Sequence, residues 1–231
     1  MRIRRVERNA ENRMANWVSA GCGVIANELA QAMEKRGQKL YGVVNRTQEK
    51  AVAFAEKYGV QKVFTSFQDV CADPAVDIIY ISTPHNTHIH FLRKALAAGK
   101  HVLCEKPLAP TPKQTVELFE AAKEKGVFLM EAYAYLHSPF VTALKKEIEE
   151  GTIGEIRYIE SQFLTSYYDK SNIRLHKENY GGAVYDLGCY NTSMLLKLLE
   201  DMPSRVKAMA QYDENGVDIY TAALLNYEND V

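Results

Sequence analysis

The chain has 231 residues, of which 47% are hydrophobic and 25% are charged. This composition is typical of a globular protein with one or two hydrophobic cores. The 28 basic and 29 acidic residues give a formal net charge of -1, so no overall basic field favours nucleic acid or anionic lipid. No apolar run reaches the length that crosses a bilayer. The sequence therefore predicts a cytoplasmic protein that binds neither nucleic acid nor membrane.

Residues 1–13 contain five arginines, and no apolar stretch follows that would complete a signal peptide. We expect a flexible leader there, with Met14 as a candidate for the natural start. The four cysteines are scattered and form no CxxC pair, so we expect small buried thiols in a reducing compartment rather than disulfides. They are Cys22, Cys71, Cys104 and Cys189.

Up to residue 131, short apolar runs alternate with stretches of helical periodicity. The pattern predicts strands at 17–20, 40–44, 62–64, 76–82, 101–104 and 127–131, and helices at 25–35, 48–57, 87–98 and 112–125. Strands that alternate with helices of this length indicate βαβ units and a parallel sheet.

After residue 131 the pattern changes. It predicts helices at 140–150 and 183–199, and strands at 205–211 and 220–227. Residues 154–164 alternate as an antiparallel strand with one solvated face would. The sequence thus predicts a doubly wound parallel α/β domain over 14–131, followed by an α+β, mostly antiparallel sheet domain over 132–231.

A glycine-rich turn joins the first predicted strand to the first helix. It reads Gly21, Cys22, Gly23, Val24, Ile25 and Ala26, which fits G-x-G-x-x-G/A. The first glycine permits a tight turn, the second lets the backbone approach a pyrophosphate, and the small sixth residue lets helix and strand pack closely. The free N–H groups of the helix start suit phosphate. The motif alone is weak, because structural turns and methyltransferases share it, but its strand–turn–helix context predicts nucleotide binding.

The end of the second strand discriminates between nicotinamide cofactors. An NAD site needs Asp or Glu there to bind the ribose 2′-OH, whereas this chain has Asn45, Arg46 and Thr47. No carboxylate repels a 2′-phosphate, and the guanidinium of Arg46 suits one. The alternative is a solvated loop arginine. We expect NADP, with NAD the less favoured cofactor.

Two further motifs follow predicted parallel strands, at the ends where doubly wound folds bind ligands. One begins with Thr83 and Pro84 and ends with His88, and the other is Glu105, Lys106 and Pro107. Together with the glycine-rich turn and the run from Gly181 to Tyr190 (GGAVYDLGCY), they resemble the Gfo/Idh/MocA oxidoreductases. The dihydrodiol dehydrogenase and NADP-dependent xylose dehydrogenase branch is the nearest. The resemblance extends from about Asn16 to the end of the chain.

The resemblance implies a Rossmann domain, a mostly antiparallel second domain, and hydride transfer between a nicotinamide and a hydroxyl-bearing carbon of a sugar, polyol or diol. It makes Lys106 the catalytic lysine, and it places Asp186 and Tyr190 at the second catalytic pair. Besides the glycine-rich turn, Asn45 and Arg46, the expected cofactor-binding residues are Thr83, Pro84, His88, Glu105 and Lys106.

Alcohol oxidation supports these roles independently, because the hydroxyl proton must leave as hydride departs. A tyrosine can accept that proton if a nearby cation lowers its pKa, and Lys106 could supply the cation. Asp186 and Tyr190 are four residues apart, so on a helix they share one face. Taken singly, the three residues could be a surface lysine, a helix-end acid and a core tyrosine. Their combination favours catalysis.

The spacing of His85, His88 and His90 could suggest zinc, but no carboxylate or thiolate completes a set, so we expect no metal. We expect His88 to line the nicotinamide pocket, and His85 and His90 to be solvated. Glu131 and Tyr133 fall at the predicted domain junction, where relatives contribute residues to the substrate pocket.

Family members continue beyond the length of this chain, with strands that close the second sheet and usually form a dimer face. We therefore expect an incomplete second domain, and a homo-oligomer if the sheet is completed. Three explanations stay open: a truncated working enzyme, a compact variant, or a degraded copy. Alternative functions are an NADP-binding regulator without turnover and a non-redox enzyme that uses NAD transiently. A methyltransferase would have no use for the two strand-end motifs.

Replacement of Arg46 tests the cofactor prediction. We expect Arg46→Ala to weaken NADPH binding much more than NADH binding, because only NADPH carries the 2′-phosphate that the guanidinium would neutralise. Titration of nicotinamide fluorescence measures both affinities. Equal losses would mean that Arg46 does not contact a 2′-phosphate.

Overall fold

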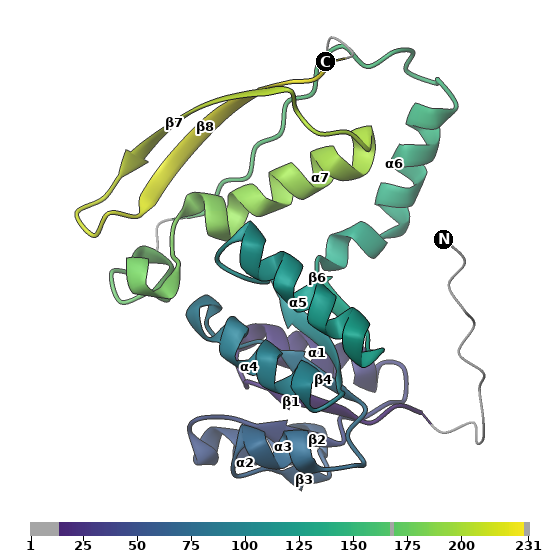
Figure 1. The fold of residues 1–231 in the computed structure, drawn as a ribbon, viewed down its shortest axis with the longest axis vertical. Helices are drawn as coiled ribbons and strands as arrows, with labels where there is room; N and C mark the ends of the chain where they lie inside the picture. The colour runs from purple at the N-terminus through teal and green to yellow at the C-terminus, as the bar shows by residue number, and fades with distance from the viewer. Residues whose placement is uncertain (1–13, 167–168, 229–231) are drawn as a thin grey trace. The chain divides into compact units, whose positions relative to one another are not determined.

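The computed structural model describes residues 14–166 and 169–228; the expected leader at 1–13 lies outside the described residues. The chain divides into two compact units, residues 1–79 and residues 80–231. Figure 1 labels their elements. One six-stranded sheet has the order β3-β2-β1-β4-β5-β6, which is the order of a doubly wound Rossmann sheet. The predicted fold class is confirmed.

In its described residues, 14–79, the first unit contains three strands, three helices and the first half of β4. Its elements are β1 (Trp17–Ala20), α1 (Val24–Glu34), β2 (Gly42–Val44), α2 (Gln48–Tyr58), β3 (Lys62–Val63) and α3 (Phe67–Ala72). Strand β2 pairs in parallel with both β1 and β3. Small residues of α1 and aromatic residues of α2 share one buried cluster that includes Ala26, Ala30, Phe54 and Tyr58. Helix α3 was not predicted, because its six residues are too few to show a helical period.

The second unit begins within β4 (Ile78–Ile81), whose side chains are almost all buried. It continues with α4 (His85–Ala97), β5 (His101–Glu105), α5 (Pro112–Lys125) and β6 (Leu129–Ala132), and β5 pairs in parallel with β6. Local signals fix α5: Thr111 caps its first turn by accepting from the Gln114 N–H, Pro112 opens it, and Gly126 ends it in a left-handed conformation.

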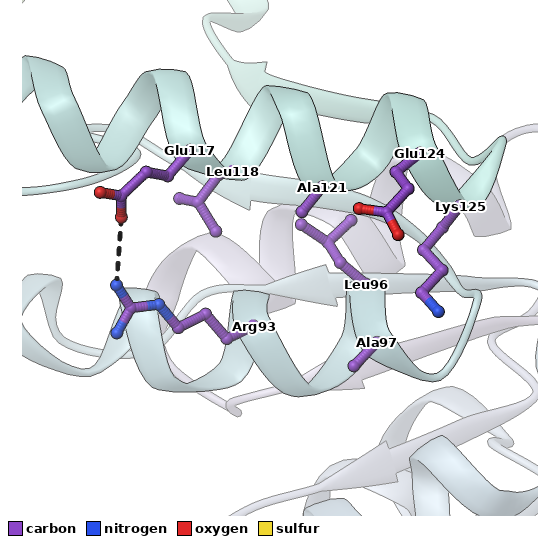
Figure 2. Close-up of a pocket in the computed structure, with 8 residues that line it drawn as sticks. All are labelled: Arg93, Leu96, Ala97, Glu117, Leu118, Ala121, Glu124 and Lys125. Carbon is purple, nitrogen blue, oxygen red and sulfur yellow. Dashed lines mark hydrogen bonds and ion pairs between the residues drawn. The ribbon is translucent and has the colours of Figure 1, made fainter.

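Helices α4 and α5 lie side by side, with a shallow hollow of about 200 Å³ between them (Figure 2). Arg93 on α4 pairs with Glu117 on α5 at 3.4 Å, and both side chains are about half exposed. Such a pair contributes little to stability. The buried residues Leu96 and Leu118 hold the two helices together, and no candidate site residue lines the hollow.

The rest of the second unit carries short helical turns, two helices and a hairpin. They are η1 (Ala134–His137), α6 (Pro139–Glu149), η2 (Ile173–Leu175), η3 (Lys177–Asn179), the π-helical turn η4 (Val184–Gly188), α7 (Cys189–Leu199), β7 (Arg205–Tyr212) and β8 (Asp218–Asn226). Strands β7 and β8 form an antiparallel pair. Asp218 of β8 accepts from the Val184 N–H at 2.8 Å, so it caps the turn that carries Asp186.

The strand predicted at 154–164 is wrong. The segment is irregular backbone with mostly exposed side chains. Its alternation of apolar and polar residues describes which face of a strand would be buried, but a strand also needs a neighbour to accept its hydrogen bonds. Among the described residues, β7 and β8 pair only with each other. The second sheet is antiparallel as expected, but it has two strands there.

In the described part of the chain, every helix is too short or too polar to cross a membrane. All four cysteines are described and are free thiols, with Cys71 and Cys104 buried and Cys22 and Cys189 half-buried. Burial is thus as expected for Cys71 and Cys104, whereas Cys22 and Cys189 are more exposed than expected.

Gly42 offers a test of the packing between β2 and its neighbours. A Cβ at this position would lie 2.4 Å from a ring carbon of Phe64, which is itself buried. We expect Gly42→Ala to lower the free energy of unfolding by about 1–3 kcal/mol through overpacking, measured by urea denaturation. Gly188→Ala is the control, because its backbone is helical and its nearest contact would be 3.6 Å. Equal stability of the two variants would contradict the overpacking argument.

Candidate active site

The glycine-rich turn has the geometry that the motif predicts. Gly21 has φ 113°, a conformation that favours glycine, and its N–H donates to the Val44 carbonyl at 2.9 Å. Ala26 is wholly buried in the cluster between α1 and α2, so the helix packs closely on its surroundings. The two reasons for small residues at these positions are therefore both met.

The start of α1 suits an anion. Gly23 is its N-cap and supplies no side-chain hydrogen bond, and the first turn contains no acidic residue. The orphan N–H groups of a helix start and its positive dipole end favour phosphate. A Cβ on Gly23 would have no atom within 4 Å, so open space adjoins the turn. Val24 and Ile25 are exposed beside it. The residues present fit a dinucleotide pyrophosphate.

Two cationic residues, Arg46 and Lys50, lie between the end of β2 and the first turn of α2. Arg46 is exposed directly after β2, and Asn45 donates to the Thr47 carbonyl at 3.0 Å. Burial raises the pKa of the Cys22 thiol to about 11, and the charge of Lys50 opposes that shift. Lys50 therefore lies close enough to the turn for its charge to act there. The sequence analysis missed Lys50, since a lysine in the first turn of a helix is common on protein surfaces.

The Lys106 ammonium is buried beside Asp186, and this pair forms the centre of the candidate site in the second unit. Its Nζ donates to the Asp186 main-chain oxygen at 2.6 Å and to Oδ1 at 3.2 Å. The same Nζ lies 4.6 Å from the centre of the Tyr190 ring. Lys106 is 9% exposed and Asp186 is 4% exposed. The structure thus brings together the three residues that the sequence predicted as catalytic.

One expectation about Tyr190 is wrong. Its pKa is raised to about 12, first by burial and then by nearby anionic groups including Glu105. The Lys106 ammonium lies over the face of the ring, and Asp186 neutralises it, so it does not lower the pKa of the phenol as expected. Tyr190 is consequently protonated at neutral pH.

An aromatic cluster surrounds Tyr190. Its members are Tyr133, Tyr135, Phe163 and Tyr190, with ring centres 5.3–6.1 Å apart where they pair. The Tyr135 hydroxyl donates to the Tyr190 carbonyl at 3.2 Å, and burial raises the pKa of Tyr133. Tyr133, which the sequence placed near the substrate pocket, therefore packs against a predicted catalytic residue. Glu131 instead accepts from the Leu108 N–H at 2.7 Å.

His88 ties together the two strand-end motifs. It is completely buried, and its ring nitrogens lie 3.0 Å from the Pro107 carbonyl oxygen and 2.8 Å from the Thr83 carbonyl oxygen. Burial lowers the pKa of His88. A neutral imidazole has one N–H, so His88 donates to one of these two carbonyls and lies against the other. Its ring thereby links the EKP loop (Glu105, Lys106 and Pro107) to the loop after β4.

The other members of these motifs have defined contacts. Pro84 is the N-cap of α4, and its carbonyl accepts from the Thr87 hydroxyl at 2.7 Å. Glu105 accepts from the Tyr80 hydroxyl at 2.5 Å. His90 is exposed as expected, but His85 is half-buried. Burial, together with the neighbouring His88, lowers the pKa of His85 to about 4. The described residues contain no group of three His, Cys, Asp or Glu that could hold a metal ion.

Sequence reasoning also missed Arg174. Its Nε lies 2.8 Å from Asp186 Oδ2. Arg174 belongs to η2, in a segment without hydrophobic periodicity, so no spacing in the sequence pairs it with the carboxylate. Only the tertiary structure brings the two together.

The Rossmann sheet and the glycine-rich turn are the features that define the class of dinucleotide-binding folds. Comparison with known proteins names the family. Residues 15–133 match the model of the oxidoreductase family with an NAD-binding Rossmann fold (GFO_IDH_MocA), and residues 141–231 match the GFO/IDH/MocA C-terminal domain. The chain belongs to the Gfo/Idh/MocA family.

Named relatives have the same fold. The trans-1,2-dihydrobenzene-1,2-diol dehydrogenase of Mus musculus is 32% identical over 221 residues, which are 93% of this chain and 66% of the relative. A 3-ketoreductase from Actinomadura kijaniata, solved with NADP and TDP-benzene, is 28% identical with a TM-score of 0.87, covering 95% of this chain and 68% of that one. An NAD-binding protein from Listeria innocua is 28% identical with a TM-score of 0.85, covering 94% and 65%. The chain therefore spans about two thirds of the length of these relatives.

Gly23→Ala separates folding from nucleotide binding. The free space around Gly23 leads us to expect an unchanged circular dichroism spectrum and at most a modest loss of stability from the poorer N-cap. We expect the Kd for NADPH and NADH to rise at least about tenfold, because the methyl group would stand where the pyrophosphate approaches. Isothermal titration calorimetry measures it. Unchanged affinity would show that this turn does not bind the nucleotide.

Proposed function

We propose that this protein is an NADP-dependent oxidoreductase that transfers hydride between the nicotinamide and a hydroxyl-bearing carbon of a sugar, polyol or diol. The observation that carries the proposal is the buried Lys106–Asp186 pair beside Tyr190. Relatives of the family include a diol dehydrogenase, an aldose–aldose oxidoreductase and a levoglucosan dehydrogenase, which supports hydroxyl-bearing substrates.

In the proposed division of the chain, residues 14–131 bind the cofactor and residues 132–231 supply the substrate side. The first family model ends at residue 133 and the second begins at residue 141, which supports this division. Arg46, with Lys50 nearby, would neutralise a 2′-phosphate, and none of the residues directly after β2 (Asn45, Arg46 and Thr47) is an acid that could bind a free 2′-hydroxyl. These features favour NADP over NAD. When bound, the cofactor supplies or accepts the hydride.

The chain's own residues would handle the proton and the charge. Lys106 would donate a hydrogen bond to the reacting oxygen, because Asp186 engages two of its three N–H groups. This contact stabilises negative charge that develops on the oxygen during carbonyl reduction. Tyr190 is protonated at neutral pH and would donate the proton to that oxygen. Asp186 would hold Lys106 in place rather than touch the substrate.

The shell around the pair would exclude water. Tyr133 and Phe163 pack against Tyr190, and the Lys106–Asp186 pair itself is almost fully buried. Water exclusion strengthens the electrostatic contacts of the site. An apolar wall of rings also suits the C–H face of a sugar ring or a cyclic diol. We propose that such a ring is the substrate's common feature.

The decisive experiment compares Lys106→Met with wild type. We expect wild type to oxidise members of a panel of cyclic diols and sugars with NADP, followed by absorbance of the reduced cofactor. Lys106→Met should lose at least about a thousandfold in kcat/KM while its Kd for NADPH stays within a few-fold. Lys113→Met, an exposed lysine at the start of α5, is the control and should retain activity.

Two outcomes would contradict the proposal. If wild type binds NADPH but turns over no alcohol or ketone in the panel, the chain is a cofactor-binding protein without this activity. If Lys106→Met retains turnover, the lysine is not the catalytic group.

A further inference from the structure

A cation lies on each oxygen of the Asp186 carboxylate. Lys106 Nζ is 3.2 Å from Oδ1, and Arg174 Nε is 2.8 Å from Oδ2. Asp186 is almost fully buried, whereas the Arg174 side chain is 36% exposed. The carboxylate therefore joins a buried lysine on one side to an arginine that extends toward solvent on the other.

Arg174 offsets much of the cost of burying this charge. Burial disfavours the ionised form of Asp186, yet its pKa lies below the usual value, chiefly because of the hydrogen bond and charge of Arg174 and the charge of Lys106. A buried carboxylate that loses one partner carries an uncompensated charge. Arg174 thus contributes to holding the pKa of Asp186 below its usual value.

The ionised state of Asp186 decides where Lys106 points. The ammonium is held by Oδ1 and by the Asp186 main-chain oxygen at 2.6 Å, which fixes two of its three N–H groups. Protonation of the carboxylate would remove the charged acceptor and leave only the main-chain contact. The third N–H would then lose its fixed direction.

Other titratable groups that face Asp186 are uncharged at neutral pH. They are His85 from α4, and Cys189 and Tyr190 from α7. Burial lowers the pKa of His85 to about 4, raises that of the Cys189 thiol and raises that of Tyr190 to about 12. The positive charges of Arg174 and Lys106 lower the pKa of Asp186.

The backbone around Arg174 is fixed independently of its side chain. Its carbonyl accepts from the Gly182 N–H at 2.8 Å, and a Cβ on Gly181 would lie 2.3 Å from that oxygen. The carbonyl of Leu175, the residue after Arg174, also accepts from the Asn215 side chain at 3.1 Å. A change confined to the Arg174 side chain should leave this segment in place.

We propose that Arg174 is a positioning residue for the catalytic lysine, which acts by holding Asp186 ionised so that the carboxylate fixes the Lys106 ammonium toward the substrate oxygen. Its effect on turnover rests on the proposed oxidoreductase function. Its effect on the ionisation of Asp186 does not, so the two can be tested separately.

The test uses Arg174→Gln and Arg174→Lys, with Arg157→Gln as the matched control. Arg157 is an arginine of the same unit that pairs with Glu155 at 2.7 Å, with both side chains about two-thirds exposed. In wild type, NMR of protein labelled at the aspartate 13Cγ follows the titration of Asp186, assigned with Asp186→Asn. Since the folded pKa is depressed, the ionised pair persists at neutral pH and is lost as pH falls through that value.

We expect Arg174→Gln to move the Asp186 titration to higher pH by at least about one unit, since the guanidinium no longer opposes the effect of burial. The acid limb of kcat/KM should move in the same direction, so that kcat/KM measured on that limb falls at least about tenfold while the Kd for NADPH stays within twofold. Arg174→Lys should restore most of the activity. Arg157→Gln should match wild type in every measurement.

An Asp186 titration and an acid limb that are both unchanged in Arg174→Gln would overturn the proposal. If wild type shows no turnover, the proposed function fails, and the NMR titration alone still decides whether Arg174 sets the ionisation of Asp186. If Arg174→Gln does not fold, Arg174→Lys supplies the comparison. A single lysine donor in place of the guanidinium should shift the titration slightly upward, and a shift downward would overturn the proposal.

Discussion

The ion pair between Lys106 and Asp186 is the contact on which the second unit's site depends. The two residues are 80 positions apart in the chain, and each is less than 10% exposed. A buried charge without its partner is strongly destabilising, so both backbones must be held at hydrogen-bonding distance. His88 fixes the loop that carries Lys106, and Asp218 caps the π-helical turn that carries Asp186. The surrounding structure can be understood as the support for this one contact.

The two units are suited to charged groups by different means. In the first unit, the glycine-rich turn offers backbone N–H groups and the helix dipole to a phosphate, and it needs small residues rather than charged ones. In the second unit, side-chain charges meet in a low-dielectric environment, where each interaction is stronger but costs more desolvation. The first arrangement suits a ligand with fixed negative charge. The second suits a reacting oxygen whose charge develops only during the reaction.

Sequence patterns predicted the first unit and much of the second because the signals there are local. The period of apolar residues gave the strands and helices of the Rossmann sheet, and α5 begins at Pro112 and ends at Lys125 as predicted. The strand predicted at residues 154–164 was wrong because strand formation depends on a non-local signal. Their alternation carries information about the two faces of a strand, but whether a strand forms is decided by a pairing partner elsewhere in the chain.

The sequence alone determined the βαβ order and the glycine-rich turn, because spacing and residue type suffice to specify them, and its resemblance to the Gfo/Idh/MocA family pointed to Lys106, Asp186 and Tyr190. Tertiary structure alone decided their electrostatics. Burial raises the pKa of Tyr190, His88 contacts two backbone carbonyls, and Arg174 joins the carboxylate of Asp186. These outcomes depend on desolvation and on distances between segments far apart in the chain. The local pattern of residues determines neither quantity.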